Sequence, residues 1–334
     1  MKIVLSLVAV VALLLLAILG VEVLGLHFLF GVVFPYAAIV IFLGGMIYRV
    51  VDWAKSPVPF RIPTTCGQEK SLPWIKSSRL DNPHDGVGVI GRMALEVLFF
   101  RSQFRNTRAE IKEGRAVYGP DKWLWIGALA FHYSFLVVFL RHMRFFAEPV
   151  PGFTVFLQSL DGFFQVGVPV VYASTFLLVA SVAYLFARRI YDAKVRYISL
   201  LSDYFPLFLL LGIGTTGVIL RHFIKTDIVT VKELGMGLLS FRPVAPEVHW
   251  LFYGHLFLVS VLFMYFPFSK LVHLGGVFLS PTRNLANNNR MVRHINPWNA
   301  PVKVHTYEEY EDEFRDKMIE AGLPVEHPER ATKE

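Results

Sequence analysis

Residues 123–146 have the sequence WLWIGALAFHYSFLVVFLRHMRFF, an apolar stretch that carries His132 and His142. A helix that crosses a bilayer needs about 20 mostly apolar residues, and an ionisable side chain inside it is costly enough to indicate a function. A second apolar stretch, residues 250–273, carries His255 and His273. Two membrane helices with two histidines each predict that the histidines meet in pairs between the helices.

Paired histidines are the ligands that b-type haem requires. Such haem is held non-covalently by two neutral imidazoles, one on each face of the iron. The chain has one cysteine, Cys66, and no Cys-x-x-Cys-His motif, so it provides neither a four-cysteine iron–sulfur cluster nor a covalent haem attachment. We therefore expect two haems b, with His132, His142, His255 and His273 as the iron ligands.

The spacings of the two histidine pairs differ. At a rise of 1.5 Å per residue, His132 and His142 are separated by about 15 Å along a helix, whereas His255 and His273 are separated by about 27 Å. Pro267 lies between His255 and His273, where it predicts a kink in the helix. Such a kink would absorb part of the difference between the two separations.

The composition indicates an all-α integral membrane protein. Hydrophobic residues make up 54% of the chain, with 30 Phe, and the mean hydropathy is +0.48, more than the core of a soluble domain requires. Six transmembrane helices are expected, at residues 3–21, 28–48, 124–142, 167–187, 205–221 and 250–272. The first of them, behind Lys2, also fits a secretory signal peptide.

These helices divide the chain into four parts. Residues 1–50 hold two N-terminal transmembrane helices, residues 51–122 a cytoplasmic connection, residues 123–273 a four-helix diheme core, and residues 274–334 a cytoplasmic tail with a helix near residues 307–321. Within the connection, residues 92–114 are expected to form an interfacial helix, which either faces lipid or docks a soluble partner. The GxGxxG pattern at residues 86–91 follows no predicted strand, so we expect a turn there and no dinucleotide site.

Basic residues set the expected orientation, because Lys and Arg accumulate in cytoplasmic loops. The connection from Lys55 to Lys122 holds twelve of them. The loops on the opposite side hold six, which are Arg141, Arg144, Arg221, Lys225, Lys232 and Arg242. Both termini are therefore placed in the cytoplasm, so that His132 pairs with His273 in the inner half of the membrane and His142 pairs with His255 in the outer half.

Protonatable and polar groups gather at the outer end of the predicted bundle. They are His142, Arg144, Glu148, Asp161, Gln165, His222 and His249. Besides binding haem, such groups can face a quinone head group, which needs a proton acceptor and apolar walls for its ring. His222 is the best base, with Glu148 and Asp161 as carboxylates that relay protons and Arg144 as a cofactor-binding cation. Either His222 or His249 could instead replace one of the predicted ligands of the outer haem. A further alternative for His222 is that it only contacts lipid head groups at the end of its helix.

Several phrases carry a resemblance to a known family. They are FGVVFPYAAIVIFLGGMIYR at residues 30–49, SPVPFRIPTTCGQ at 56–68, SLPWIK at 71–76, FHYSFLVVFLRHMRFF at 131–146 and SLDGFFQVGVP at 159–169. With the histidine spacings, the chain resembles the respiratory nitrate reductase gamma subunit family of diheme cytochromes b. Within it, the likeness is to membrane cytochrome b subunits of complexes associated with dissimilatory sulfite reduction. The resemblance covers the chain to about residue 300 and departs from the five-helix gamma subunit by an extra first helix.

The resemblance implies a function and partners. Such a subunit exchanges electrons with menaquinol and passes them through two haems to a cytoplasmic iron–sulfur subunit akin to heterodisulfide reductase, in sulfate or sulfite respiration. It also implies a second membrane subunit, a periplasmic multihaem cytochrome c, a periplasmic iron–sulfur subunit and a small sulfur-carrier protein as the end substrate. It supports the same histidine pairs, and the expected location is the cytoplasmic membrane, with lipid but no nucleic acid as a further partner.

Two other classes of protein remain open. A proton-coupled multispan transporter also uses intramembrane histidines, although the six helices show no internal repeat. A non-redox membrane anchor for a peripheral complex would leave the four histidines without a use.

Overall fold

The computed structural model describes residues 1–56, 78–105, 108–165, 169–288, 295 and 305–329. This part of the chain contains six helices that are long and apolar enough to cross a membrane. They are Lys2–Val23, Leu29–Ala54, Lys122–Phe145, Ala173–Tyr191, Leu201–Ile224 and Trp250–Phe268. The prediction of an all-α membrane protein with six transmembrane helices is confirmed. Cys66, the motif at 71–76 and all but the first residue of the motif at 56–68 lie outside the described residues.

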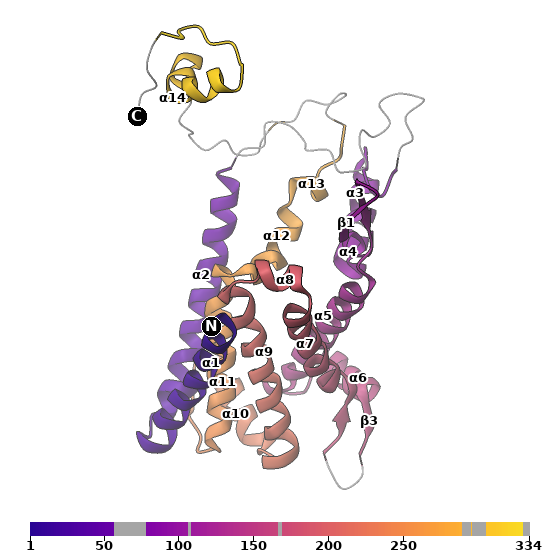
Figure 1. Cartoon of the computed structure of the whole chain (residues 1–334). Helices are drawn as coiled ribbons and strands as arrows, with labels where there is room; N and C mark the ends of the chain where they lie inside the picture. The colour runs from indigo at the N-terminus through magenta and orange to yellow at the C-terminus, as the bar shows by residue number, and fades with distance from the viewer. Residues whose placement is uncertain (57–77, 106–107, 166–168, 289–294, 296–304, 330–334) are drawn as a thin grey trace. The chain divides into compact units, whose positions relative to one another are not determined.

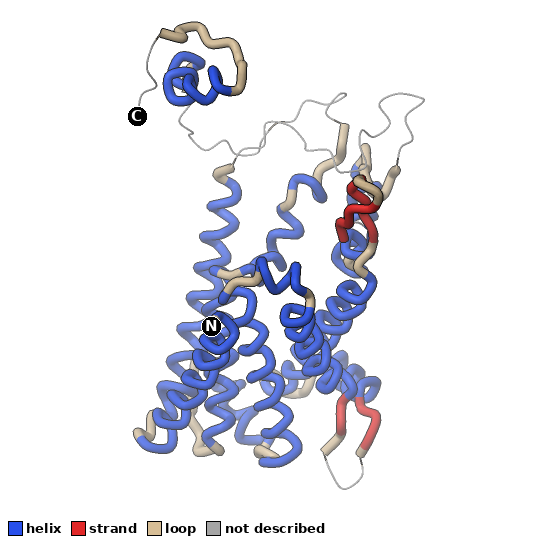
Figure 2. The backbone as a smooth tube through the Cα atoms, viewed as in Figure 1, coloured by secondary structure: helices blue, strands red, loops and turns tan. Residues whose placement is uncertain are grey.

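Five of the six spanning helices combine an α-helix with a short π- or 3₁₀-helical segment, and the fourth is the single helix α7. Figures 1 and 2 show how the helices are arranged. In chain order they are α1 (Lys2–Ile18) with η1 (Leu19–Val23), η2 (Leu29–Val33) with α2 (Phe34–Ala54), α5 (Lys122–His142) with η3 (Met143–Phe145), α7 (Ala173–Tyr191), α9 (Leu201–Ile219) with η4 (Leu220–Ile224), and α11 (Trp250–Tyr265) with η5 (Phe266–Phe268). The remaining helices lie between the spans or after the last one. They are α3 (Gly86–Phe99), α4 (Arg101–Arg105), α6 (Gly152–Asp161), α8 (Ala193–Ile198), α10 (Ile228–Leu239), η6 (Lys270–Val272), α12 (His273–Leu279), α13 (Pro281–Asn284) and α14 (Tyr307–Glu320).

The helices of the bundle follow one another as neighbours. Helix α5 packs on α7, α7 on α9 and α9 on α11, while α1 packs on both α9 and α11. The histidine helices α5 and α11 therefore stand at the two ends of an arc. Ala17 of α1 is fully buried, so α1 is packed into the bundle. This is expected of a transmembrane helix.

The predicted kink at Pro267 is present as a break in the last spanning helix. Helix α11 ends at Tyr265, two short 3₁₀ turns follow, and α12 begins at His273. Proline cannot donate the helical hydrogen bond and its ring disturbs the preceding turn. From α2, the Nε of Arg49 donates a hydrogen bond to the carbonyl oxygen of Pro267 over 2.9 Å, which holds the broken segment against the neighbouring helix.

The connection before α5 differs from the prediction in two places. The glycines at 86–91 form no turn: they lie in α3, which begins after Asp85 accepts a hydrogen bond from the Gly88 amide over 2.7 Å. The helix expected over 92–114 is broken at Phe100, which has φ of 50°, and its second part, α4, ends at Arg105. Further along, β1 (Arg108–Lys112) pairs antiparallel with β2 (Arg115–Gly119). The residues between the strands, Glu113 and Gly114, have φ of 52° and 75°, the two left-handed positions of a tight hairpin turn.

A second small hairpin shortens the fourth spanning helix. Strands β3 (Gly162–Phe164) and β4 (Val171–Tyr172) pair antiparallel, so that α7 begins at Ala173 rather than at residue 167.

The chain divides into two compact units, Met1–Val51 with Phe60–His294, and Asp52–Pro59 with Ile295–Glu334. The second unit contains α14, which confirms the predicted tail helix. Thr306 and Glu309 form a capping box at its start. Inside it, the fully buried Arg315 forms an ion pair with Glu311, whose carboxylate also accepts the Glu326 and His327 amides over 2.7 and 2.9 Å. These bonds lower the pKa of Glu311 below its usual value, which keeps the carboxylate charged.

Two neighbouring glycines of α2 predict different effects of the same substitution. A Cβ on Gly45 would lie 2.7 Å from the Cβ of Pro267, whereas a Cβ on Gly44 would meet nothing within 4 Å. We expect Gly45→Ala to lower the free energy of unfolding by about 1–3 kcal/mol, because the proline ring cannot move aside. Gly44→Ala should be neutral or stabilise by up to about 1 kcal/mol. Thermal unfolding in detergent checks both, and equal midpoints would contradict the tight contact.

Candidate functional site

The inner pair of histidines, His132 and His273, meets as predicted. His132 comes from α5 and His273 is the first residue of α12, and their ring centroids lie 5.9 Å apart with an interplanar angle of 81°. An iron bound by two imidazole nitrogens at about 2 Å, with each ring centre about 1 Å further out, places the ring centres about 6 Å apart. The observed separation fits a bis-histidine iron.

Hydrogen bonds fix which nitrogen of each inner ring is available. The Nδ1 of His132 lies 2.8 Å from the carbonyl oxygen of Ala128, and the Nδ1 of His273 lies 2.9 Å from that of Lys270. A carbonyl oxygen only accepts, so each Nδ1 carries the proton and donates. Each Nε2 is left with its lone pair, which is the form that a metal-ligating histidine needs.

The outer pair, His142 and His255, has the same arrangement of protons. The Nδ1 of His142 donates to the carbonyl oxygen of Val138 over 2.7 Å. The Nδ1 of His255 lies 2.9 Å from the hydroxyl oxygen of Thr216. Because the single hydroxyl proton of Thr216 is donated to the Gly212 carbonyl at 2.7 Å, its oxygen accepts from His255.

His142 ends α5 and His255 lies in α11, and the described residues show no ring contact between them. The protein leaves the ring of His142 exposed, so its Nε2 is open to a group bound beside α5. The inner pair therefore fits a predicted haem by ring separation and by the position of its protons, and the outer pair fits by the position of its protons.

The two rival histidines differ from these four. His249 precedes α11, and its Nδ1 accepts a hydrogen bond from the Leu251 amide over 3.2 Å, which places the proton on Nε2 and leaves no lone pair there for iron. His222 lies in η4, and its Nε2 is buried without a hydrogen-bond partner in the described part of the chain. Its ring is tilted against that of Phe176 at 6.4 Å.

The carboxylates predicted for the outer end are already paired. Glu148 forms an ion pair with Lys232. Asp161 lies 3.3 Å from the Nε of Arg141 and accepts the amide and hydroxyl of Ser174 over 2.8 and 2.6 Å. No contact among the described residues joins either carboxylate to His222. Arg144 is half-buried in η3, and Gln165 is exposed after β3.

The structure adds a cationic cluster at the outer end that the sequence analysis missed. Arg141 and Arg221 were expected in loops, but Arg141 is buried in α5 and Arg221 lies in η4. Their guanidinium carbons lie 3.8 and 4.6 Å from the centre of the Tyr172 ring, so both make cation–π contacts with it. The available signal was the position of Arg141 next to His142 inside an apolar stretch.

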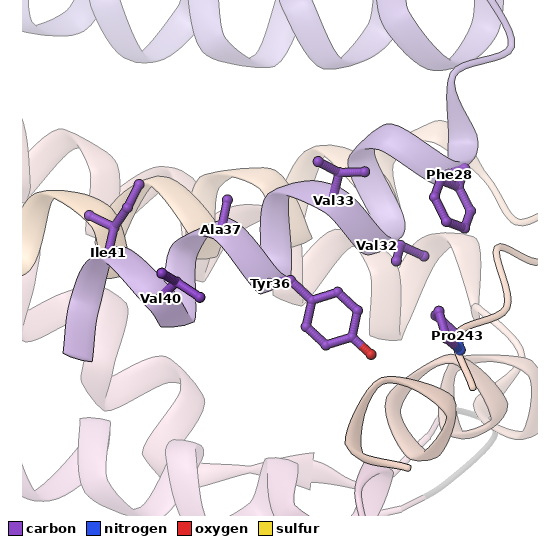
Figure 3. Close-up of a pocket in the computed structure, with 8 residues that line it drawn as sticks. All are labelled: Phe28, Val32, Val33, Tyr36, Ala37, Val40, Ile41 and Pro243. Carbon is purple, nitrogen blue, oxygen red and sulfur yellow. The ribbon is translucent and has the colours of Figure 1, made fainter. Parts of the chain in front are cut away.

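An apolar groove of about 580 Å³ lies elsewhere, between the outward side of α2 and Pro243. Figure 3 shows its lining residues, among them Phe28 and Tyr36, and none of the histidines discussed above belongs to it. The histidine pairs therefore remain the candidate site.

Comparison with known proteins finds similarity along most of the chain. Residues 94–294 match the family model described as nitrate reductase gamma subunit. The chain is similar to the "Hdr-like menaquinol oxidoreductase cytochrome b-like subunit" of Archaeoglobus fulgidus, with 48% identity over 81% of this chain and 83% of that protein. It is also similar to the protein of the same description from Archaeoglobus profundus, with 43% identity over 79% of this chain and 81% of that protein.

Thr216 should tune haem binding at the outer pair. Thr216→Val keeps the side-chain shape but removes the acceptor for the Nδ1 proton of His255, so we expect outer haem affinity to fall about 10–100-fold. Thr215→Val is the matched control, since Thr215 is exposed one residue earlier in α9. Haem titration of the purified variants measures the difference, and equal haem occupancy would refute the role of this hydroxyl.

Proposed function

The chain belongs to the nitrate reductase gamma subunit family of membrane cytochromes b, and on this premise we propose that it carries two haems b between menaquinol and a cytoplasmic iron–sulfur partner. The observation that supports two haems is the hydrogen bonding of the four histidines. Each of them donates its Nδ1 proton to an oxygen atom of the protein, which leaves Nε2 available for iron. A b haem in such a site supplies one-electron transfer.

In this proposal each pair holds one haem. His132 and His273 hold the inner haem and His142 and His255 the outer one. Hydrogen bonds to Nδ1 fix the orientation of each ring and raise the basicity of Nε2, so the pairs are prepared to bind iron from opposite faces.

The distribution of charge supports placing both termini in the cytoplasm. Three of the six basic residues assigned to the outer loops, Arg141, Arg144 and Arg221, lie within the spanning helices, which leaves three on that side. The bias of Lys and Arg towards the connection between the second and third spans is thus larger than the sequence count suggested. The inner haem then faces the cytoplasmic side of the cytoplasmic membrane.

Menaquinol would be oxidised at the outer end, with His222 as the proton acceptor. Its Nε2 is buried and has no hydrogen-bond partner among the described residues, whereas Asp161 is held by Arg141 and Ser174. With its carboxylate held in this way, Asp161 would orient the cationic cluster. Glu148, whose side chain is 63% exposed beside Lys232, would provide a path for protons to water. Arg144, two residues after His142, would bind an anionic group of the outer haem or the quinol oxygen.

The partners proposed are those of a menaquinol oxidoreductase complex in sulfate or sulfite respiration. The description of the two archaeal relatives and the motifs at residues 30–49 and 131–146 support this. They would comprise a cytoplasmic heterodisulfide-reductase-like iron–sulfur subunit, a second membrane subunit, a periplasmic multihaem cytochrome c and a periplasmic iron–sulfur subunit. The basic inner surface would attract an acidic partner.

Haem loss should follow the histidine pairs. Replacing His132 or His273 by Ala should deplete the same haem, and replacing His142 or His255 should deplete the other, because one lost imidazole opens a coordination position on a single iron. Reduced-minus-oxidised spectra with a haem assay measure this, and His249→Ala is the control that should retain both. A wild-type protein without b-haem bands would instead favour a transporter or a non-redox anchor.

His222 should matter for electron entry rather than for haem binding. In His222→Gln we expect both haems to remain and their reduction by a menaquinol analogue to slow by about 10²–10⁴-fold, the usual contribution of a positioned base. Stopped-flow absorbance of the haem bands measures the rate, with reduction by dithionite as the control. Wild-type kinetics in this variant would exclude His222 from the mechanism and leave the two-haem proposal intact.

A further inference from the structure

The inner ligand His273 stands on a segment that has little structure of its own. Between the end of α11 at Tyr265 and His273, the chain forms only two three-residue 3₁₀ turns. Such turns have poorer hydrogen-bond geometry than an α-helix and do not propagate its rigidity. The position of the His273 ring must therefore be set by contacts from neighbouring helices.

Asp203 of α9 provides such a contact. Its Oδ1 lies 2.7 Å from the Nζ of Lys270, and the carbonyl oxygen of Lys270 accepts the Nδ1 proton of His273 over 2.9 Å. The chain of contacts Asp203, Lys270, His273 thus leads from the start of a neighbouring helix to an iron ligand. We infer that the Asp203–Lys270 ion pair positions His273 for the inner haem, an inference that rests on the function proposed above.

The carboxylate end of this ion pair is held independently of Lys270. The side chain of Asp203 is 4% exposed, its Oδ2 accepts the Leu200 amide over 2.9 Å, and Arg189 of α7 approaches its Oδ1 to 3.8 Å. Exposed ion pairs usually contribute little because two mobile side chains must be ordered. Here only the lysine, which is 69% exposed, has to be ordered, so the pair can fix the turn that Lys270 begins.

The rest of the broken segment is held in the same way. Arg49 binds the Pro267 carbonyl, and the hydroxyl of Tyr265 donates to the Ser202 carbonyl over 3.4 Å. Ser269 accepts the Leu271 amide over 3.2 Å at the start of the second turn. Of these contacts, Asp203–Lys270 is the one that reaches the residue whose carbonyl binds His273. Asp203 and Lys270 are therefore positioning residues for the inner haem.

The test is a redox titration of both haems in two variants that break the pair from either side. Asp203→Asn keeps an acceptor for the Leu200 amide but removes the charge, and Lys270→Met keeps the aliphatic stem. If the pair positions His273, both variants weaken its Nδ1 hydrogen bond, lower the basicity of Nε2 and destabilise ferric iron. Both should raise the midpoint potential of the inner haem and leave the outer haem unchanged.

Two further variants serve as controls. Lys270→Arg keeps the ion pair and should restore the wild-type potential. Asp192→Asn is the matched control, because Asp192 caps α8 through the Lys194 and Val195 amides at 3.0 and 3.3 Å and has no part in the chain of contacts to His273. The double variant of Asp203 and Lys270 should shift the potential no further than either single variant.

The outcomes separate the inference from simpler explanations. A through-space charge effect would raise the potential in Asp203→Asn and lower it in Lys270→Met, and such opposite shifts would overturn the inference. Unchanged inner potentials, or equal shifts of both haems, would overturn it as well. Because Lys270 is exposed, Lys270→Met decides the matter even if Asp203→Asn fails to fold. Absence of two b haems in the wild-type protein would refute the proposed function too, whereas failure in a two-haem protein refutes only the inference.

Discussion

Each imidazole inside the membrane must satisfy two nitrogens, and the bundle is built around that requirement. A polar group in hydrocarbon without a partner costs several kcal/mol. In α5, His132 and His142 each place the Nδ1 proton on the carbonyl four residues earlier in their own helix. This local bond uses up the proton and directs Nε2 away from the helix. The second nitrogen then has to be satisfied from outside the helix, which the proposed shared iron would do for two rings at once.

The unequal spacings along the two histidine helices explain why one of them is broken. Ten residues on α5 correspond to about 15 Å, whereas eighteen on a continuous helix would span about 27 Å. Ending α11 at Tyr265 and restarting at His273 frees the second ligand from the helix axis, so that His273 reaches His132 at 5.9 Å. The break in turn requires outside support, which Arg49 and Asp203 supply.

The sequence was sufficient for features that depend on local pattern. Hydropathy located six spans, and proline chemistry located the break at Pro267. Pairing of His132 with His273 followed from antiparallel topology. The hairpin at residues 108–119 was missed because its glutamate and glycine turn lies inside a stretch with helical residues. The stacking of Arg141 and Arg221 on Tyr172 joins residues far apart in sequence, and only the fold brings them together.

Helix α9 connects the two histidine pairs although it carries no ligand. Near its inner end Asp203 holds Lys270, whose carbonyl binds His273, and thirteen residues later Thr216 accepts the proton of His255. At 1.5 Å per residue these two contacts are about 20 Å apart, comparable to the separation of the histidine pairs along the bundle. His255 thus donates to a side chain of α9, and His273 donates to the carbonyl of Lys270, whose side chain pairs with Asp203 of α9. The two histidines of α5 donate to carbonyls of their own helix. A displacement of α9 would change the ligand geometry of both sites together, and a displacement of α5 would carry its two ligands as a rigid unit.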